Sequence, residues 1–127
     1  MNALKTGLAG LALVISGLQA FVQETEAKLR VVKDLPKLQA EALYYDAVRA
    51  RLKGDEKEAE KLFTEVTRID PEAAGAYYEL SNIYERNKKV DKASEYIKKA
   101  ISLQDGNKYY KEQYAMILAD QNKFEEG

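Results

Sequence analysis

Apolar side chains recur along most of this chain every three or four residues, which is the spacing of one face of an α-helix. One such stretch carries Leu43 and Ala47 and is followed by Gly54 and Asp55. Glycine is favoured just after a helix end, and aspartate just before a helix start. The pattern therefore predicts two helices that meet at this turn, the second over residues 56–69.

The second helix of this pair is also apolar on one side. The residues on that side are Ala59, Leu62, Phe63, Val66 and Ile69. Asp55, followed three residues later by Glu58, has the form of an acidic capping box at the helix start. Asp70 and Pro71 close the unit, because proline cannot continue a helix.

The whole pair returns after 34 residues. Residues 40–73 align with residues 74–107 without a gap, and a third, incomplete copy begins at Lys108. Small residues recur in phase, as at Ala47 and Ser81. One helix pair cannot cover its own apolar face, so neighbouring pairs must stack. We predict an all-α fold, an α-solenoid of antiparallel helix pairs with about two and a half repeats and an extra N-terminal helical segment.

This pattern resembles the tetratricopeptide repeat (TPR) over roughly residues 38–126. The second unit carries the family's residue types at the family's spacing: Tyr77, Leu80, Ser81, Tyr84, Ala93, Ile97 and Ala100. The first unit carries Leu43, Ala47, Ala59, Phe63 and Pro71. The departures are Asp46, Ala50, Asp105 and Lys111, which stand where leucine, tyrosine, proline and an aromatic residue are usual. In the third unit, residues 122–126 resemble the turn into a second helix.

The first twenty residues resemble a secretory signal peptide. Lys5 precedes an apolar run over residues 8–18, and Ala20 follows as a cleavage point. The run is shorter than the ~20 apolar residues that a membrane span needs. Three interpretations stay open: a cleaved export signal, an uncleaved anchor with membrane contact through residues 1–22, and a helix packed on the repeats.

A helical bridge follows this segment. Ala27, Val31 and Leu35 stand at helical spacing, so a short helix is expected over residues 24–35. Pro36 is expected to end it, because proline disfavours helix in the residue before it. We therefore divide the chain into five parts: 1–20, 21–37, 38–73, 74–107 and 108–127.

The composition argues against several classes of function. Twenty basic residues are balanced by twenty-one acidic ones, so no broad basic field is available for nucleic acid. The chain has no histidine and no cysteine, which removes the commonest general base and the usual zinc ligands. Acidic pairs such as Glu58 and Glu60 are expected on solvated helix faces. We predict no catalytic residues, no metal and no cofactor.

The TPR resemblance implies a concave groove lined by the first helix of each pair, where a partner peptide or protein would bind. The groove residues that it implies are Tyr44, Val48, Arg51, Tyr78, Asn82, Glu85, Arg86, Tyr109, Glu112 and Met116. Tyrosine suits such a surface, because its ring gives contact area at low entropic cost and its hydroxyl gives direction.

Some TPR proteins grip the acidic C-terminal tails of heat-shock chaperones with a clamp of lysine, asparagine and arginine. The corresponding positions here are Tyr44, Val48, Glu79, Tyr109 and Gln113, none of which is a cation. We predict that this chain does not bind such tails.

The sequence thus favours a non-catalytic interaction module, exported by a bacterium and either periplasmic or membrane-tethered. One alternative is a structural role as the start of a longer TPR array, with homo-oligomer formation through the open C-terminal end. Another is a regulatory subunit that recruits an enzyme.

Overall fold

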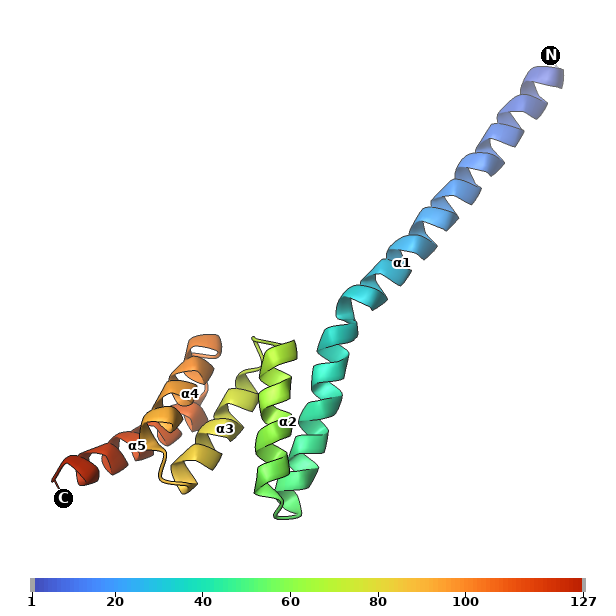
Figure 1. Cartoon of the computed structure of the whole chain (residues 1–127). Coiled ribbons are helices and arrows are strands. Elements are labelled where there is room, and N and C mark those ends of the chain that lie inside the picture. Colours follow the sequence, from blue (N-terminus) through green and yellow to red (C-terminus); the bar gives the residue numbers. More distant parts are fainter. Residues whose placement is uncertain (1, 127) are drawn as a thin grey trace. The chain divides into compact units, whose positions relative to one another are not determined.

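The computed structural model describes the backbone of residues 2–126 and the side chains of residues 14–122. The described backbone forms helices α1 (Asn2–Leu52), α2 (Glu56–Ile69), α3 (Ala74–Arg86), α4 (Val90–Leu103) and α5 (Lys108–Glu126), and it contains no strand (Figure 1). The predicted all-α class is therefore confirmed. The chain divides into two units, Met1–Leu35 and Pro36–Gly127.

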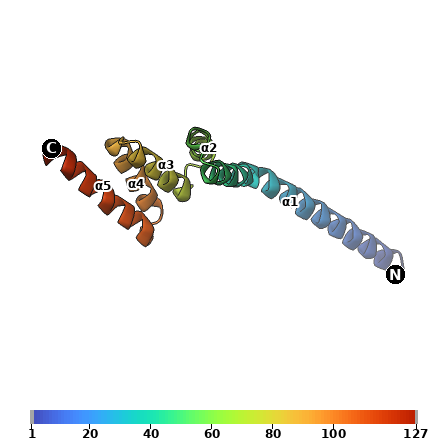
Figure 2. The same ribbon diagram turned by 90° about the horizontal axis from the view of Figure 1, so that it is seen from below.

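In the second unit the helices pack in the order of the sequence. α2 packs against α3, α3 against α4, and α4 against α5. The last part of α1 joins this series through Tyr44 and Phe63, whose ring centroids lie 5.4 Å apart. Figure 2 shows α3, α4 and α5 as successive layers. This is the stacking of helix pairs that the 34-residue period predicts.

The turn between α1 and α2 uses the residues that the sequence singles out. Gly54 has a φ of 82°, in the left-handed region that favours glycine. The Asp55 carboxylate accepts a hydrogen bond from the Glu58 amide at 3.2 Å and so caps α2. The Asp55 amide donates instead to the Ala50 carbonyl at 2.9 Å. The aspartate thus supplies the cap, while the reciprocal half of the capping box is not formed.

Small and bulky residues alternate in the core of the second unit. The fully buried positions include Ala47, Ala59, Phe63, Leu80, Ser81, Ala93 and Ile97. The Ser81 hydroxyl donates to the Ala93 carbonyl at 2.9 Å, which links α3 to α4 where the two helices pack. Buried small residues allow this close approach, and the bulky residues fill the remaining space.

Two expected helix ends are wrong. α1 continues through Pro36, and α5 continues to Glu126 without a turn at residue 122. An internal proline costs a helix about 3 kcal/mol, which the long helical segments on both sides, one of them anchored by buried Ala40 and Ala47, can offset. The turn at residue 122 lacks a glycine, and the hydrogen bonds of α5 continue past it.

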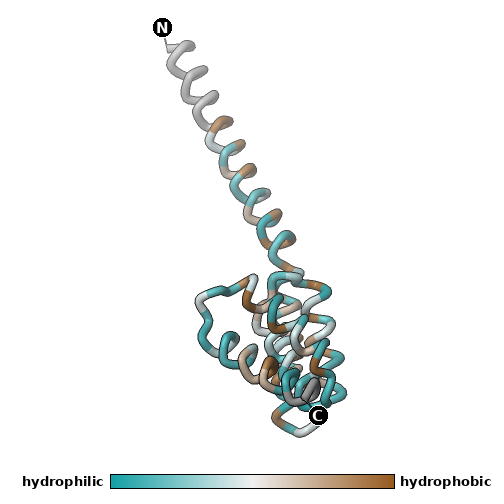
Figure 3. The backbone as a smooth tube through the Cα atoms, turned by 90° about the vertical axis from the view of Figure 1, so that its left-hand side faces the viewer, coloured by the Kyte–Doolittle hydropathy of each residue, from teal (hydrophilic) through white to brown (hydrophobic). Residues whose placement is uncertain are grey.

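In the first unit, every side chain described, from Val14 to Leu35, is exposed. Lys5 and the early part of the apolar run lie outside the residues whose side chains are described. Figure 3 shows apolar and polar positions alternating along this helix. Among the described residues, no helix has both the length and the apolar character needed to span a bilayer.

Candidate peptide-binding surface

Tyr44 lies where α1 meets the start of α3. A Cβ atom added at Gly75 would stand 3.2 Å from the Tyr44 hydroxyl oxygen, so glycine leaves room for the ring. The ring is half-buried and meets Tyr45 edge to face at 6.1 Å. Burial raises the pKa of the Tyr44 hydroxyl, and the negative charge of Glu79 raises it further.

A partly buried ion pair joins α1 to α3 beside this ring. Arg51 Nε lies 3.3 Å from Glu79 Oε2, and only 14% of the Glu79 side chain is exposed. Burial raises the pKa of the Glu79 carboxyl, although the charges of Arg51 and Arg86 oppose this shift. Arg51 makes no hydrogen bond through Nε, so the contact is mainly electrostatic. The predicted groove residue Arg51 is therefore held by a carboxylate that the predicted set omits.

On α5, the tyrosine that contacts Tyr78 is Tyr110, the neighbour of the predicted groove residue Tyr109. The rings of Tyr78 and Tyr110 lie 5.0 Å apart, which links α3 to α5. Tyr110 is only 6% exposed, whereas Tyr109 is 59% exposed, with Lys108 Nζ 5.1 Å from its ring centroid. Burial raises the pKa of the Tyr110 hydroxyl, and Tyr78 and Glu79 add to the shift.

These contacts define a tyrosine cluster, which consists of Tyr44, Arg51, Tyr78, Glu79 and Tyr110. Its members come from α1, α3 and α5, the first helices of the three pairs. The negative charge of Glu79 acts on the hydroxyls of both Tyr44 and Tyr110. Four of the five have partly exposed side chains, and only Tyr110 is buried, so the cluster has an open side with aromatic rings and a paired charge.

Two further predicted residues, Glu85 and Arg86, lie near the end of α3. Burial raises the pKa of the Glu85 carboxyl, and the nearby Asp120 carboxyl of α5 raises it further. Arg86 turns toward α2, with its Nε 3.3 Å from Glu56 Oε2. Glu85 therefore faces α5, while Arg86 is engaged by the neighbouring pair of helices.

The other predicted residues are placed as follows. Val48 and Asn82 are half-buried, and Glu112 and Met116 are exposed on α5. Sequence reasoning omitted Glu79, Tyr110 and Asp120 from the surface. A charged residue between Tyr78 and Leu80 was a usable signal for Glu79, whereas the roles of Tyr110 and Asp120 depend on how α5 is rotated against α3.

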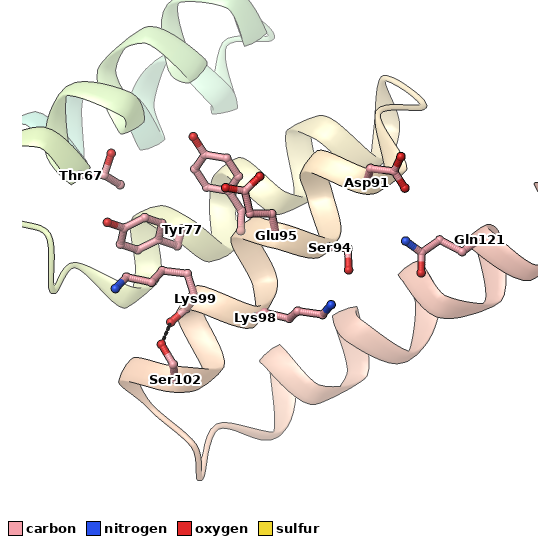
Figure 4. A pocket seen from close by; sticks show the side chains of 10 residues that line it. Thr67, Tyr77, Asp91, Ser94, Glu95, Lys98, Lys99, Ser102 and Gln121 are labelled. Carbon is pink, nitrogen blue, oxygen red and sulfur yellow. Dashed lines mark hydrogen bonds between the residues drawn. The ribbon is translucent and has the colours of Figure 1, made fainter.

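An open cleft and a smaller cavity lie on the second unit. An open cleft of about 850 Å³ runs along α4, with charged and hydroxyl side chains from Asp91 to Ser102 (Figure 4). The Ser102 hydroxyl in this cleft donates to the Lys99 carbonyl at 2.7 Å. A smaller cavity of about 270 Å³ lies beside Tyr44 and Gly75. Across the described side chains, no group of three or more acidic residues is arranged to hold a metal ion.

Residues 50–120 match the family model described as tetratricopeptide repeat. The chain belongs to the TPR family. Two solved structures resemble it. One is MamA protein, with a TM-score of 0.62 and 23% identity over 65% of this chain and 45% of MamA. The other is the first TPR of Spaghetti (RPAP3) bound to the HSP90 peptide SRMEEVD, with a TM-score of 0.61 and 21% identity over 68% of this chain and 71% of that chain. At these identities the likeness supports the fold alone. The aligned region spans less than half of MamA. A search of curated proteins found no match.

The TPR positions of the chaperone-tail clamp hold no cation here. Tyr44 packs against Phe63, Glu79 is an acid, and Gln113 is buried. Arg51, the nearest basic side chain that the structure pairs with these positions, is already engaged by Glu79. An acidic peptide tail would meet a carboxylate where the clamp supplies positive charge.

Proposed function

We propose that this TPR chain is a non-catalytic module that binds a peptide or protein segment on the open side of the tyrosine cluster. The observation that carries this proposal is the contact of Tyr78 with Tyr110, together with the Arg51–Glu79 ion pair on the same side of α3 and the action of the Glu79 charge on both Tyr44 and Tyr110. Aromatic rings held in place by neighbouring helices lose little entropy when a ligand packs on them. Membership of the TPR family supports the same class of function.

The proposed partner is not an acidic chaperone tail. RPAP3 is seen with an HSP90 peptide that contains two glutamates and a terminal aspartate. In this chain, Glu79 and Glu85 bring negative charge to the surface, and both have raised pKa values because burial disfavours their ionised forms. A neutral or basic segment fits this surface better, since it would relieve that unfavourable charge.

Affinity capture from the native cell tests the role of the cluster. The bait is the full chain, compared with its Tyr78→Ala and Tyr77→Ala variants. Tyr77 is the matched control, because it is the same residue type on the same helix but packs on Tyr96 of α4 at 5.9 Å. We expect Tyr78→Ala to lose partners that Tyr77→Ala retains, after circular dichroism has shown that both variants are folded. Equal recovery with Tyr78→Ala and the unaltered chain would refute the cluster as the binding surface.

We also propose that the chain acts in the bacterial envelope, either periplasmic or tethered to the membrane. The support is the signal-like order of Lys5, the apolar run and Ala20. Mass spectrometry of the protein isolated from its native cell tests this. A mature N-terminus near Phe21 is expected for a cleaved signal, and an intact N-terminus recovered in the soluble cytosolic fraction would contradict both forms of the proposal.

A second candidate function, structural self-association, is favoured by one observation on α5. Ala115 is exposed, whereas Ala47 and Ser81, at the same place in the first two repeats, are fully buried under α2 and α4. Leu118 is likewise exposed, while Tyr84 at the equivalent place is buried. An uncovered face of this kind can pack against another chain. The Ala115→Arg variant should then remain monomeric in light scattering at concentrations where the unaltered chain associates.

A further inference from the structure

The first unit carries a regular apolar seam that the repeats do not explain. Ile15, Leu18, Val22, Leu29 and Val32 follow a spacing of three and four residues, with Thr25 at the one intervening position. We call these six residues the α1 seam. The five apolar side chains are each between 51% and 63% exposed. An alternating three-four spacing averages 3.5 residues, which is the repeat of a two-stranded coiled coil.

We propose that residues 14–35 of α1 pair with the same segment of a second copy of this chain in a two-stranded coiled coil. The pairing concerns the chain that keeps its N-terminal segment, because cleavage near Phe21 would remove Ile15 and Leu18 from the α1 seam. This goes beyond the binding role of the tyrosine cluster, because every residue of the seam lies in the first unit.

The three-four spacing of the α1 seam favours a second helix, and not a membrane surface, as the structure that packs on it. A straight helix drifts by about 20° per heptad relative to a 3.5-residue repeat, so a strict repeat stays aligned only when two helices wind around each other. A flat bilayer makes no such demand and selects a broad apolar face with a period of 3.6 residues. Off the seam, the helix carries the polar side chains expected around a solvated seam, Gln19, Gln23, Glu26 and Lys33. It also carries four exposed apolar side chains there: Val14, Phe21, Val31 and Leu35.

The seam is complementary to itself when the second copy runs antiparallel. In that alignment Ile15 lies opposite Val32 of the second copy, Leu18 opposite Leu29, and Val22 opposite Thr25, so the full seam overlaps.

The flanking residues fit the same alignment. Val14 comes beside Leu35 of the second copy, which forms one more apolar pair. Phe21 comes beside Lys28, whose ammonium group can pack on the ring, and no like charges meet. A parallel alignment would bring Lys28 beside Lys33 of the second copy, which is unfavourable. The charge pattern therefore favours an antiparallel second copy.

The proline after this segment marks the end of the seam. The next position in the three-four series is Pro36, where the first unit meets the second. Proline lacks the amide donor and disturbs the helix turn before it, so regular pairing is expected to stop there.

Adjacent valines provide a matched test by sedimentation velocity on the full chain. Val32 is on the seam and 63% exposed, and Val31 is off the seam and 58% exposed. We expect the unaltered chain to dimerise. Val32→Asp should raise the Kd of the dimer at least about tenfold, and Val31→Asp should change it less than about threefold. The reason is that only Val32→Asp buries a charge between the helices. The same comparison with Ala115→Arg, on α5, separates this interface from association through the repeats.

Cysteine cross-linking tests the orientation, since the chain has no cysteine of its own. A mixture of Val22→Cys and Thr25→Cys chains should form more disulfide-linked dimer than either variant alone. A parallel dimer would instead cross-link Val22→Cys with itself and would overturn the antiparallel alignment.

Three further results would overturn the proposal as a whole. The first is a chain that stays monomeric at concentrations of up to about 1 mM, where even a complex with a millimolar Kd would be partly formed. The second is equal loss of dimer in the two aspartate variants. The third is a monomer whose α1 binds phosphatidylglycerol vesicles and loses that binding equally in both variants, which would assign the apolar face to a lipid surface.

Discussion

Ser81 provides the most direct test of how neighbouring helix pairs interlock. Its side chain is fully buried between α3 and α4, and its hydroxyl donates to the Ala93 carbonyl at 2.9 Å. Two substitutions separate the contributions of the hydrogen bond and of the small volume. Ser81→Ala removes the hydrogen bond and keeps the space, whereas Ser81→Leu also fills a space that the two backbones occupy.

The expected magnitudes differ for physical reasons. A buried neutral hydrogen bond contributes about 0.5–1.5 kcal/mol net. The carbonyl of Ala93 lies within α4, where helix carbonyls have intrahelical partners, so Ser81→Ala leaves no unpaired donor. Alanine also favours helix slightly more than serine, so we expect a loss of about 0.5–1 kcal/mol for Ser81→Ala. Overpacking typically costs about 1–3 kcal/mol, which brings the loss for Ser81→Leu to about 2–4 kcal/mol.

Urea and thermal unfolding, followed by circular dichroism at 222 nm, measure these losses. Each kcal/mol lowers the Tm of a domain of this size by about 4–8 °C. Ser102→Leu is the matched control, because Ser102 is exposed on α4 and its hydroxyl bonds only within its own helix. We expect it to stay within about 0.5 kcal/mol of the unaltered chain. If Ser81→Leu were no more destabilising than Ser81→Ala, close approach of α3 and α4 would not be what the small residue provides.

Three other predictions concern local conformation, titration and binding. Lys88 has a φ of 62° at the position equivalent to Gly54. Lys88→Gly should therefore raise the free energy of unfolding, measured in urea, by about 1 kcal/mol. An unchanged or lower value would contradict left-handed strain at this position. The pKa of Glu85 is raised above 4.5 by burial and by Asp120. The contribution of the protonated carboxyl to the stability of the folded chain is therefore present below pH 4.5 and is lost as the pH rises through the folded-state pKa. Glu85→Gln should therefore be more stable than the unaltered chain at pH 7 and equally stable near pH 4. If urea titrations gave the same difference in unfolding free energy between the two proteins at both pH values, this prediction would be ruled out. A fluorescently labelled acidic chaperone-tail peptide should show no micromolar binding in an anisotropy titration, and saturable micromolar binding would refute the assignment of the clamp positions.

Most of the fold could be predicted from the 34-residue period. Small residues at Ala47 and Ser81 and bulky residues such as Phe63 and Ile97 recur in phase, and the structure buries all four between stacked helices. This could be predicted because each helix pair repeats the same local solution, so its core positions are set by spacing within the pair. The turn at Gly54 followed for the same reason, since a glycine after an apolar stripe signals a helix end without reference to the rest of the chain.

Two helix ends could not be predicted in this way. Proline lowers the stability of a helix by a limited amount, and whether α1 ends at Pro36 depends on the helical segments on both sides of it. The continuation of α5 past residue 122 has a similar cause, because its sequence lacks a strong stop signal such as the glycine at position 54.

The sequence by itself determined that the chain is a series of paired helices and which positions form the core, because hydrophobic spacing specifies these locally. The tertiary structure decided which of two adjacent tyrosines, Tyr109 or Tyr110, packs on Tyr78, and that Glu79 is held by Arg51 among those rings. Adjacent residues on a helix point about 100° apart, so the rotation of α5 about its own axis decides which of the two rings is buried against α3 and which is exposed. That rotation is set by packing between helices that are far apart in the sequence.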